Sequence, residues 1–133
     1  MKYLLLTACL FFTFPVYAEK NVVLQFSDDN VKKQFVVLSI ANNLVKKYGE
    51  DINLEIVAFG PGLTLFTANT KYPEIMKSLS HKGVKLTACQ STHSRLTKAI
   101  GKDIPMNEYV DMVGGGASHI IELVSQGYIL LKP

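Results

Sequence analysis

Three short apolar runs, separated by stretches of helical periodicity, constrain the fold of this chain more than any other feature. They span residues 21–26, 54–59 and 84–89. In the first run the apolar side chains of Val22, Val23 and Leu24 fall on both faces of an extended chain, which is typical of a parallel-sheet strand covered on both sides by helices. The runs therefore predict an α/β domain.

The stretches around these runs predict the remaining elements. Gly49 and Gly83 each follow an amphipathic stretch and are natural helix ends. Before the first helix, Ser27-Asp28-Asp29-Asn30 supplies capping side chains. For Asp28 and Asp29, a metal or acid–base pair is the alternative. The predicted helices lie at residues 31–48, 73–82, 92–100 and 119–126, and two further strands lie at 109–113 and 128–131. This alternation predicts a five-stranded, mostly parallel sheet with helices on both faces.

The first eighteen residues do not fit this alternation. Lys2 precedes an apolar run from Tyr3 to Phe14, and a Val-Tyr-Ala sequence ends at Ala18. This is the pattern of a signal peptide, and the run is too short for a stable membrane span. We expect cleavage near Ala18, a single mature domain at residues 19–133, and a periplasmic or secreted protein. Lipidation of Cys9 is the alternative.

The charge of the mature chain argues against nucleic acid as a partner. Of the 14 basic side chains only Lys2 is removed, so 13 face 11 acidic ones and the net charge falls from +3 to +2. No basic stretch is dense enough to follow a phosphate backbone. Removal of Cys9 also leaves Cys89 as the one cysteine, so the domain cannot close an internal disulfide.

Cys89 is the candidate reactive residue. It ends the third apolar run, where a buried strand passes into the N-terminal turn of a helix, and ligands bind at such strand ends in open α/β sheets. Unpaired N–H groups and the helix dipole favour a thiolate there. His93, four positions on, lies on the same helical face and is a candidate to assist Cys89. The alternatives are a packed, inert cysteine and a solvent-exposed histidine.

Two glycine-containing turns are candidate ligand-binding elements. Gly60-Pro61-Gly62 forms a tight turn after the second strand, and Gly114-Gly115-Gly116 follows the fourth. The second turn would direct backbone N–H groups at an anion, with His119 lining the same crevice; ordinary turn geometry is the alternative. After the first turn, the apolar residues Leu63, Leu65 and Phe66 need cover, either from the domain itself or from another subunit. We expect a homo-oligomer with these residues near the contact.

Several of these segments together resemble the DsrE/DsrF-like family, in particular its exported single-domain members. They are Ala58-Phe59-Gly60-Pro61-Gly62, Ala88-Cys89 and the closing residues 127–133. The resemblance implies a flavodoxin-like fold, trimers or hexamers, and sulfur carried as a persulfide on a cysteine, which only Cys89 matches. Exported relatives often have Asn-Thr shortly after that cysteine, where this chain has Ser91-Thr92.

Two classes of function follow. In the first, a Cys89 thiolate accepts sulfane sulfur from a donor and passes it to the thiol of a partner protein, an exchange that needs no cofactor. In the second, the chain is a non-catalytic oligomeric module that binds a small ligand at the carboxyl ends of the strands. Flavin or nucleotide binding is a weaker alternative, and the spacing of His and Cys predicts no metal site.

Overall fold

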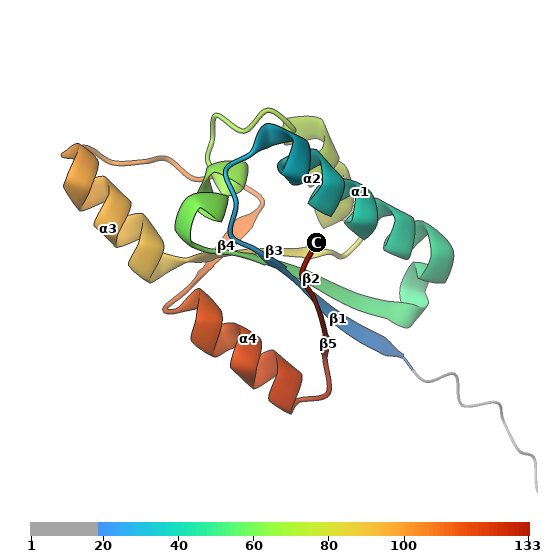
Figure 1. Cartoon of the computed structure of the whole chain (residues 1–133). Helices are drawn as coiled ribbons and strands as arrows, with labels where there is room; N and C mark the ends of the chain where they lie inside the picture. Colours follow the sequence, from blue (N-terminus) through green and yellow to red (C-terminus); the bar gives the residue numbers. More distant parts are fainter. Residues whose placement is uncertain (1–18) are drawn as a thin grey trace, which may run out of the picture.

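The computed structural model describes residues 19–133, so the predicted signal peptide and Cys9 lie outside the described residues. Five strands alternate with helices along the chain (Figure 1). The strands are β1 (Lys20–Phe26), β2 (Ile52–Ala58), β3 (Lys85–Cys89), β4 (Val110–Val113) and β5 (Ile129–Leu131). The α-helices are α1 (Val31–Tyr48), α2 (Pro73–His81), α3 (Gln90–Ile100) and α4 (Gly116–Ser125), with short 3₁₀ helices η1 (Gly49–Asp51) and η2 (Gly60–Phe66).

The strands form one sheet in the order β4-β3-β2-β1-β5, and every neighbouring pair is parallel. The prediction of a five-stranded α/β sheet with helices on both faces is confirmed, and the layers are those of a flavodoxin-like fold. The first four strands add successively in one direction, and β5 returns to the far side of β1. Because each crossover is right-handed, this single reversal places α4 on the face opposite α1 and α2 (Figure 1).

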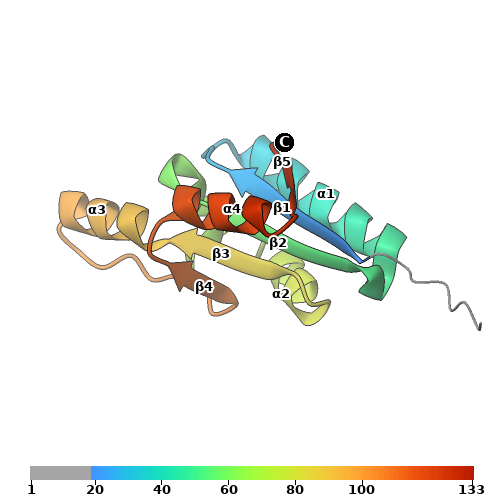
Figure 2. The ribbon, with the colours of Figure 1, turned by 90° about the horizontal axis from the view of Figure 1, so that it is seen from below.

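The two faces of the sheet are covered unequally. On one face α1, α2 and η2 bury most of the core; on the other, α4 lies alone against the sheet (Figure 2). Successive residues of a strand point to opposite faces. In β2, Leu54 and Ile56 therefore join the larger cluster, whereas Val57 packs with Ile120 and Leu123 of α4. The α4 face has a small apolar core and carries polar strand residues.

Local sequence signals explain where α1 begins and ends. Asn30 is its N-cap residue, and its side-chain oxygen accepts hydrogen bonds from the N–H groups of Lys32 and Lys33 at 2.9 and 3.3 Å. Gly49 follows the helix with a φ of 55°, a conformation that favours glycine. Asn30 therefore makes the capping contacts expected of this segment, whereas Asp28 accepts a hydrogen bond from the Asn30 N–H before the helix begins and does not cap it.

Two helices begin earlier than the sequence predicts. α3 begins at Gln90, directly after β3, instead of at Thr92, and α4 begins at Gly116 instead of at His119. The residue before each helix makes no side-chain capping hydrogen bond, so the usual sequence signal for a helix start is missing. Both helices therefore start at the carboxyl edge of the sheet, immediately beside Cys89.

The assignment of Leu63, Leu65 and Phe66 to a subunit contact is wrong. All three are at most 1% exposed and belong to the core on the α1 and α2 face. The segment that follows Gly60-Pro61-Gly62 is the 3₁₀ helix η2 instead of an open loop, and it folds these side chains inward. The domain therefore covers them itself. Within residues 19–133, no helix combines the length and hydrophobicity needed to cross a membrane.

Candidate functional site

Cys89 lies at the point of the sheet where the chain connections diverge. It is the last residue of β3 and the N-cap residue of α3, and β4 is the neighbouring strand. From β3 the chain passes into α3 on the α1 and α2 side, and from β4 it passes into α4 on the opposite side (Figure 1). Such divergence opens a crevice at the carboxyl ends of parallel strands. The expected position of Cys89 at a strand end is thus confirmed.

Hydrogen bonds favour the ionised form of Cys89. The residue is 5% exposed, and burial by itself raises the pKa of a thiol. The Thr92 hydroxyl and the backbone N–H groups of Thr92, Gly116 and Ser91 donate toward the sulfur, and together they bring the Cys89 pKa below its ordinary value. Two of these N–H groups belong to α3 and one to α4. The positive ends of two helix dipoles therefore converge on one sulfur atom.

Thr92 connects Cys89 to the turn after β2. The side chain is buried, and its Oγ1 accepts a hydrogen bond from the Gly60 N–H at 3.0 Å. With that contact in place, the hydroxyl proton is directed to the Cys89 sulfur. Gly60 has a φ of 55°, a backbone conformation that other residues rarely adopt. One predicted ligand-binding glycine therefore acts on Cys89 through Thr92.

The Gly114-Gly115-Gly116 turn brings α4 into contact with Cys89. A Cβ atom at Gly116 would lie 3.2 Å from Cys89 Cβ and 3.0 Å from Phe59 Cβ, so only glycine fits without movement. The Gly114 carbonyl accepts hydrogen bonds from the N–H and the hydroxyl of Ser91, at 3.1 and 2.8 Å, so the Ser91 N–H is shared between this carbonyl and the Cys89 sulfur. The turn therefore directs the Gly116 N–H at the Cys89 sulfur.

His93 faces away from the donors that act on Cys89. Its Nε2 lies 2.8 Å from the Ile104 carbonyl oxygen and 4.0 Å from Asp103 Oδ1. The imidazole thus connects α3 to the loop that follows it. The structure places His93 on the helix beside Cys89, as its spacing predicts, but directs its ring to that loop.

His119 is held beneath α4 by Glu55 of β2. Its Nε2 lies 2.7 Å from Glu55 Oε1, and the Thr87 hydroxyl donates to the same oxygen at 2.6 Å. The Glu55 side chain is 5% exposed. His119 therefore sits one helical turn from Gly116 and faces the sheet, whereas the crevice at the strand ends was its expected location.

A pocket of about 500 Å³ adjoins the opposite side of Thr92. Gly60 and Pro61 line it together with apolar atoms of α3, and Arg95 and Asp29 add charged groups. Gly62 instead packs against β1, where an added Cβ would lie 2.4 Å from the Phe26 carbonyl oxygen. The first predicted ligand-binding turn therefore divides into a part that lines a pocket and a part that packs the core.

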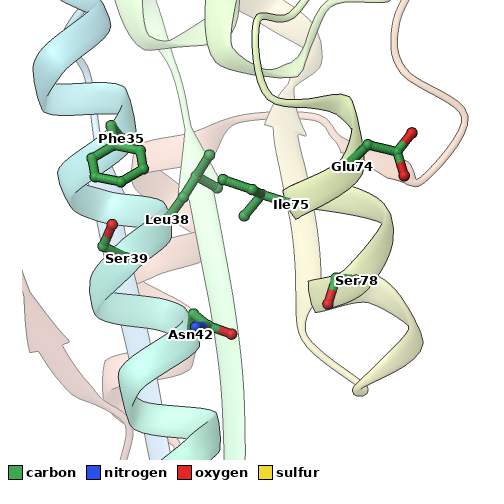
Figure 3. A pocket seen from close by; sticks show the side chains of 7 residues that line it. All are labelled: Phe35, Leu38, Ser39, Asn42, Glu74, Ile75 and Ser78. Atoms are coloured by element: carbon green, nitrogen blue, oxygen red, sulfur yellow. The ribbon is translucent and has the colours of Figure 1, made fainter.

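A second hollow lies between α1 and α2, away from Cys89. It has a volume of about 310 Å³, and Figure 3 shows Leu38 of α1 and Ile75 of α2 pointing toward each other across it. Its other lining residues are Phe35, Ser39, Asn42, Glu74 and Ser78. It shares no residue with the groups around Cys89, so it adds nothing to the chemistry of the thiol.

Sequence reasoning missed Thr92 and Glu55. A signal existed for Glu55, because a lone carboxylate between apolar strand residues needs a buried partner. For Thr92 the signal was weaker: it lies three residues after Cys89, within one turn of the helix. Within residues 19–133, the structure holds no group of three or more His, Cys, Asp or Glu side chains arranged for a metal ion.

Thr92→Val is expected to raise the pKa of Cys89. The variant removes a hydroxyl that donates to the sulfur, and one hydrogen bond is worth about 0.5–1.5 kcal/mol, or roughly half to one pKa unit. The pH profile of Cys89 alkylation should shift upward, with a roughly three- to tenfold slower reaction at neutral pH. Thr97→Val is the matched control, since Thr97 Oγ1 is buried without a hydrogen-bond partner among residues 19–133. Equal profiles for both variants would contradict the assignment.

Comparison with known proteins shows the fold. No model of a known family matches the sequence, and no curated protein matches it. Several solved structures do match it. A protein of unknown function, MTH1491 from Methanobacterium thermoautotrophicum, is 25% identical, with 86% of this chain and 99% of that chain covered and a TM-score of 0.76.

Two further structures have the same fold at lower identity. BT1422 from Bacteroides thetaiotaomicron, a conserved protein of unknown function, is 16% identical, with 90% of this chain and 100% of that chain covered and a TM-score of 0.63. The ychN protein from E. coli is 15% identical, with 86% of this chain and 99% of that chain covered and a TM-score of 0.64. The likenesses support the α/β architecture over nearly the whole described chain.

Proposed function

We propose that this protein carries sulfane sulfur as a persulfide on Cys89. The observation that carries the proposal is the convergence of hydrogen-bond donors from α3 and α4 on the Cys89 sulfur, which brings the thiol pKa below its ordinary value. A thiolate is the form of cysteine that attacks sulfur. The sequence resemblance to the DsrE/DsrF-like family, whose best understood members carry sulfur as a persulfide on a cysteine, points to the same chemistry.

The proposed cycle balances without a cofactor. The Cys89 thiolate attacks a sulfane sulfur of an inorganic polysulfide; an S–S bond forms on Cys89, an S–S bond in the donor breaks, and the donor leaves as a shorter polysulfide or hydrosulfide anion. A thiolate of an acceptor protein then attacks the outer sulfur of the persulfide. The new S–S bond forms on the acceptor, and Cys89 leaves as a thiolate, held by the same donors from α3 and α4.

The accessibility of Cys89 favours a small donor. Only 5% of the residue is exposed, so a linear polysulfide anion is a better fit than a bulky organic persulfide. The N–H groups that hold the thiolate also favour an approaching anion. Exposure of the purified mature protein to polysulfide, followed by mass spectrometry of the intact chain, tests the proposal. Addition of sulfur atoms to Cys89 is the expected result, and an unmodified Cys89 would refute it.

A binding module is the second candidate function. The pocket of about 500 Å³ beside Gly60, Pro61 and Thr92 favours it, because that pocket lies at the carboxyl edge of the sheet and is lined largely by apolar atoms. In this case Cys89 is a packed residue. Failure of small alkylating agents to react with native Cys89, together with a thiol pKa above the ordinary value, would make this the better proposal.

We also propose a homo-oligomer, a trimer or hexamer, assembled through α4 and β5. α4 exposes Ile121 and Val124 one turn apart, and the edge strand β5 exposes Ile129, Leu130 and Leu131. Ile121→Glu combined with Val124→Glu should convert the oligomer into a folded monomer in sedimentation experiments, because charge is costly in an apolar contact. Phe35→Glu, which alters an exposed apolar residue of α1, is the control and should remain oligomeric. A wild-type monomer at micromolar concentration would contradict the proposal.

Export to the periplasm or the medium remains part of the proposal, since the signal-peptide pattern ends at Ala18. The mass of the exported protein should lack residues 1–18, and an intact N-terminus would refute this.

A further inference from the structure

Glu55 and His119 form a partly buried polar contact outside the surroundings of Cys89. Glu55 lies in the middle of β2, on the face that α4 covers, and its side chain is 5% exposed. Its Oε1 accepts hydrogen bonds from the Thr87 hydroxyl at 2.6 Å and from His119 Nε2 at 2.7 Å. Burying a carboxyl group is costly, so a site that contains one needs these donors.

This contact lies where α4 has little else to hold it. The apolar cluster beneath α4 contains four buried residues: Val23, Val57, Ile120 and Leu123. Apolar contacts of this kind are non-directional and permit a helix to slide along a sheet. A hydrogen bond requires a defined distance and angle, so it does not permit such sliding. The contact between Glu55 and His119 therefore sets where α4 lies along its own axis.

The position of α4 matters because its first residue acts on Cys89. Gly116 precedes His119 by three residues, about 4.5 Å along the helix axis. A Cβ atom at Gly116 would lie 3.2 Å from Cys89 Cβ, so the start of the helix is already in contact with the cysteine. A displacement of roughly 1 Å along the axis would spoil the geometry of a hydrogen bond from Gly116 to the sulfur.

We infer that Glu55 and His119 are positioning residues that anchor α4 to β2 and thereby keep the Gly116 N–H directed at the Cys89 sulfur. Neither side chain takes part in the sulfur exchange. The inference rests on the proposed function, since it assumes that Cys89 is the reactive group. It adds a second requirement to that function: the Gly116 N–H is directed at the sulfur only while the contact between Glu55 and His119 is in place.

The test measures the pH profile of Cys89 alkylation in variants of the mature protein. Glu55→Ala and His119→Ala remove the contact, and each should raise the apparent pKa of Cys89 by about half to one unit, with a roughly three- to tenfold slower reaction at neutral pH. Glu55→Gln keeps an oxygen that accepts from both partners and should retain the wild-type profile. If Glu55→Ala does not fold, His119→Ala carries the test, because the His119 side chain is 23% exposed and its loss disturbs the core less.

The direction of the shift separates positioning from a direct effect of charge. A negative charge near a thiolate raises the thiol pKa, so loss of the Glu55 charge alone would lower the pKa of Cys89 in both Glu55→Ala and Glu55→Gln. That result would overturn the inference. Leu79→Ala, in the core on the opposite face of the sheet, is the stability control. It should lower Tm at least as much as Glu55→Ala and leave the pH profile unchanged.

Failure of the inference is distinguishable from failure of the proposed function. If wild-type Cys89 titrates at the ordinary thiol value, the proposed function loses its reactive thiolate, and the inference fails with it. If the wild-type value is lowered and both alanine variants keep it, the anchoring role alone is refuted. A loss of Tm without a change in the pH profile also refutes anchoring, because it assigns Glu55 and His119 to stability only.

Discussion

Cys89→Ser is expected to abolish persulfide formation while the fold persists. A serine hydroxyl does not ionise near neutral pH and does not form an S–S bond, and Cys89 is the one cysteine of residues 19–133. After exposure to polysulfide, the variant should therefore gain no sulfur detectable by mass spectrometry, a loss limited only by the sensitivity of the measurement. The groups that donate hydrogen bonds to the sulfur can also donate to a serine oxygen, so the free energy of unfolding should change by less than about 1 kcal/mol.

Thermal unfolding of the same preparation provides the control. A Cys89→Ser protein that melts near the wild-type Tm and carries no sulfur assigns the loss to chemistry instead of unfolding. Sulfur that remains bound to the variant would place the carrier elsewhere and would refute the role of Cys89.

Gly62→Ala is expected to cause the largest loss of stability among single-atom additions to the turn after β2. The added Cβ would lie 2.4 Å from the Phe26 carbonyl oxygen and 2.9 Å from Ser27 Cα, and backbone atoms cannot rotate away as a side chain would. Overpacking of this kind costs about 1–3 kcal/mol, and a clash with backbone belongs at the upper end. A loss of about 3 kcal/mol corresponds to a fall in Tm of roughly 10–20 °C for a domain of this size.

Gly114→Ala is the matched control for this prediction. A Cβ at Gly114 would meet no atom within 4 Å, and Gly114 is absent from the glycines with positive φ. The free energy of unfolding of the Gly114→Ala protein should differ from that of the wild type by no more than about 0.5 kcal/mol. Similar Tm values for Gly62→Ala and Gly114→Ala would show that the close approach of η2 to β1 is not required.

Gly62 also matters for the site. The Gly62 N–H donates to the Phe59 carbonyl at 3.1 Å, and the Phe59 N–H donates to the Phe26 carbonyl at 3.1 Å. These bonds hold the turn against the end of β1, so the Gly60 N–H reaches Thr92. Gly62→Ala should therefore also shift the pH profile of Cys89 toward higher pH, in the same direction as Thr92→Val.

Local patterns in the sequence were sufficient for the elements of this fold. Apolar runs on both faces of an extended chain identified β1 and β2, and Asn30 and Gly49 marked the ends of α1. These signals are readable because they depend on residues within a few positions of one another. The same local logic located Cys89 at the carboxyl end of β3, next to a helix start.

Exposure was harder to predict than secondary structure. Leu63, Leu65 and Phe66 follow a glycine turn, and the sequence alone indicated exposed side chains that need a partner. In the structure a 3₁₀ helix turns them into the core beneath α1 and α2. Whether an apolar segment after a turn folds inward depends on the space left between elements that are distant in the chain. The local periodicity of the sequence does not reveal that space.

By itself, then, the sequence determined that five strands alternate with four helices and that Cys89 ends a strand at the edge where ligands bind. Only the tertiary structure decided what surrounds that sulfur. Gly116 reaches Cys89, and His119 reaches Glu55, because the strand order places β4 beside β3 and sends α4 to the opposite face. Strand order reflects the packing free energy of the whole domain, so contacts between residues as far apart as Glu55 and His119 arise only when every layer is in place.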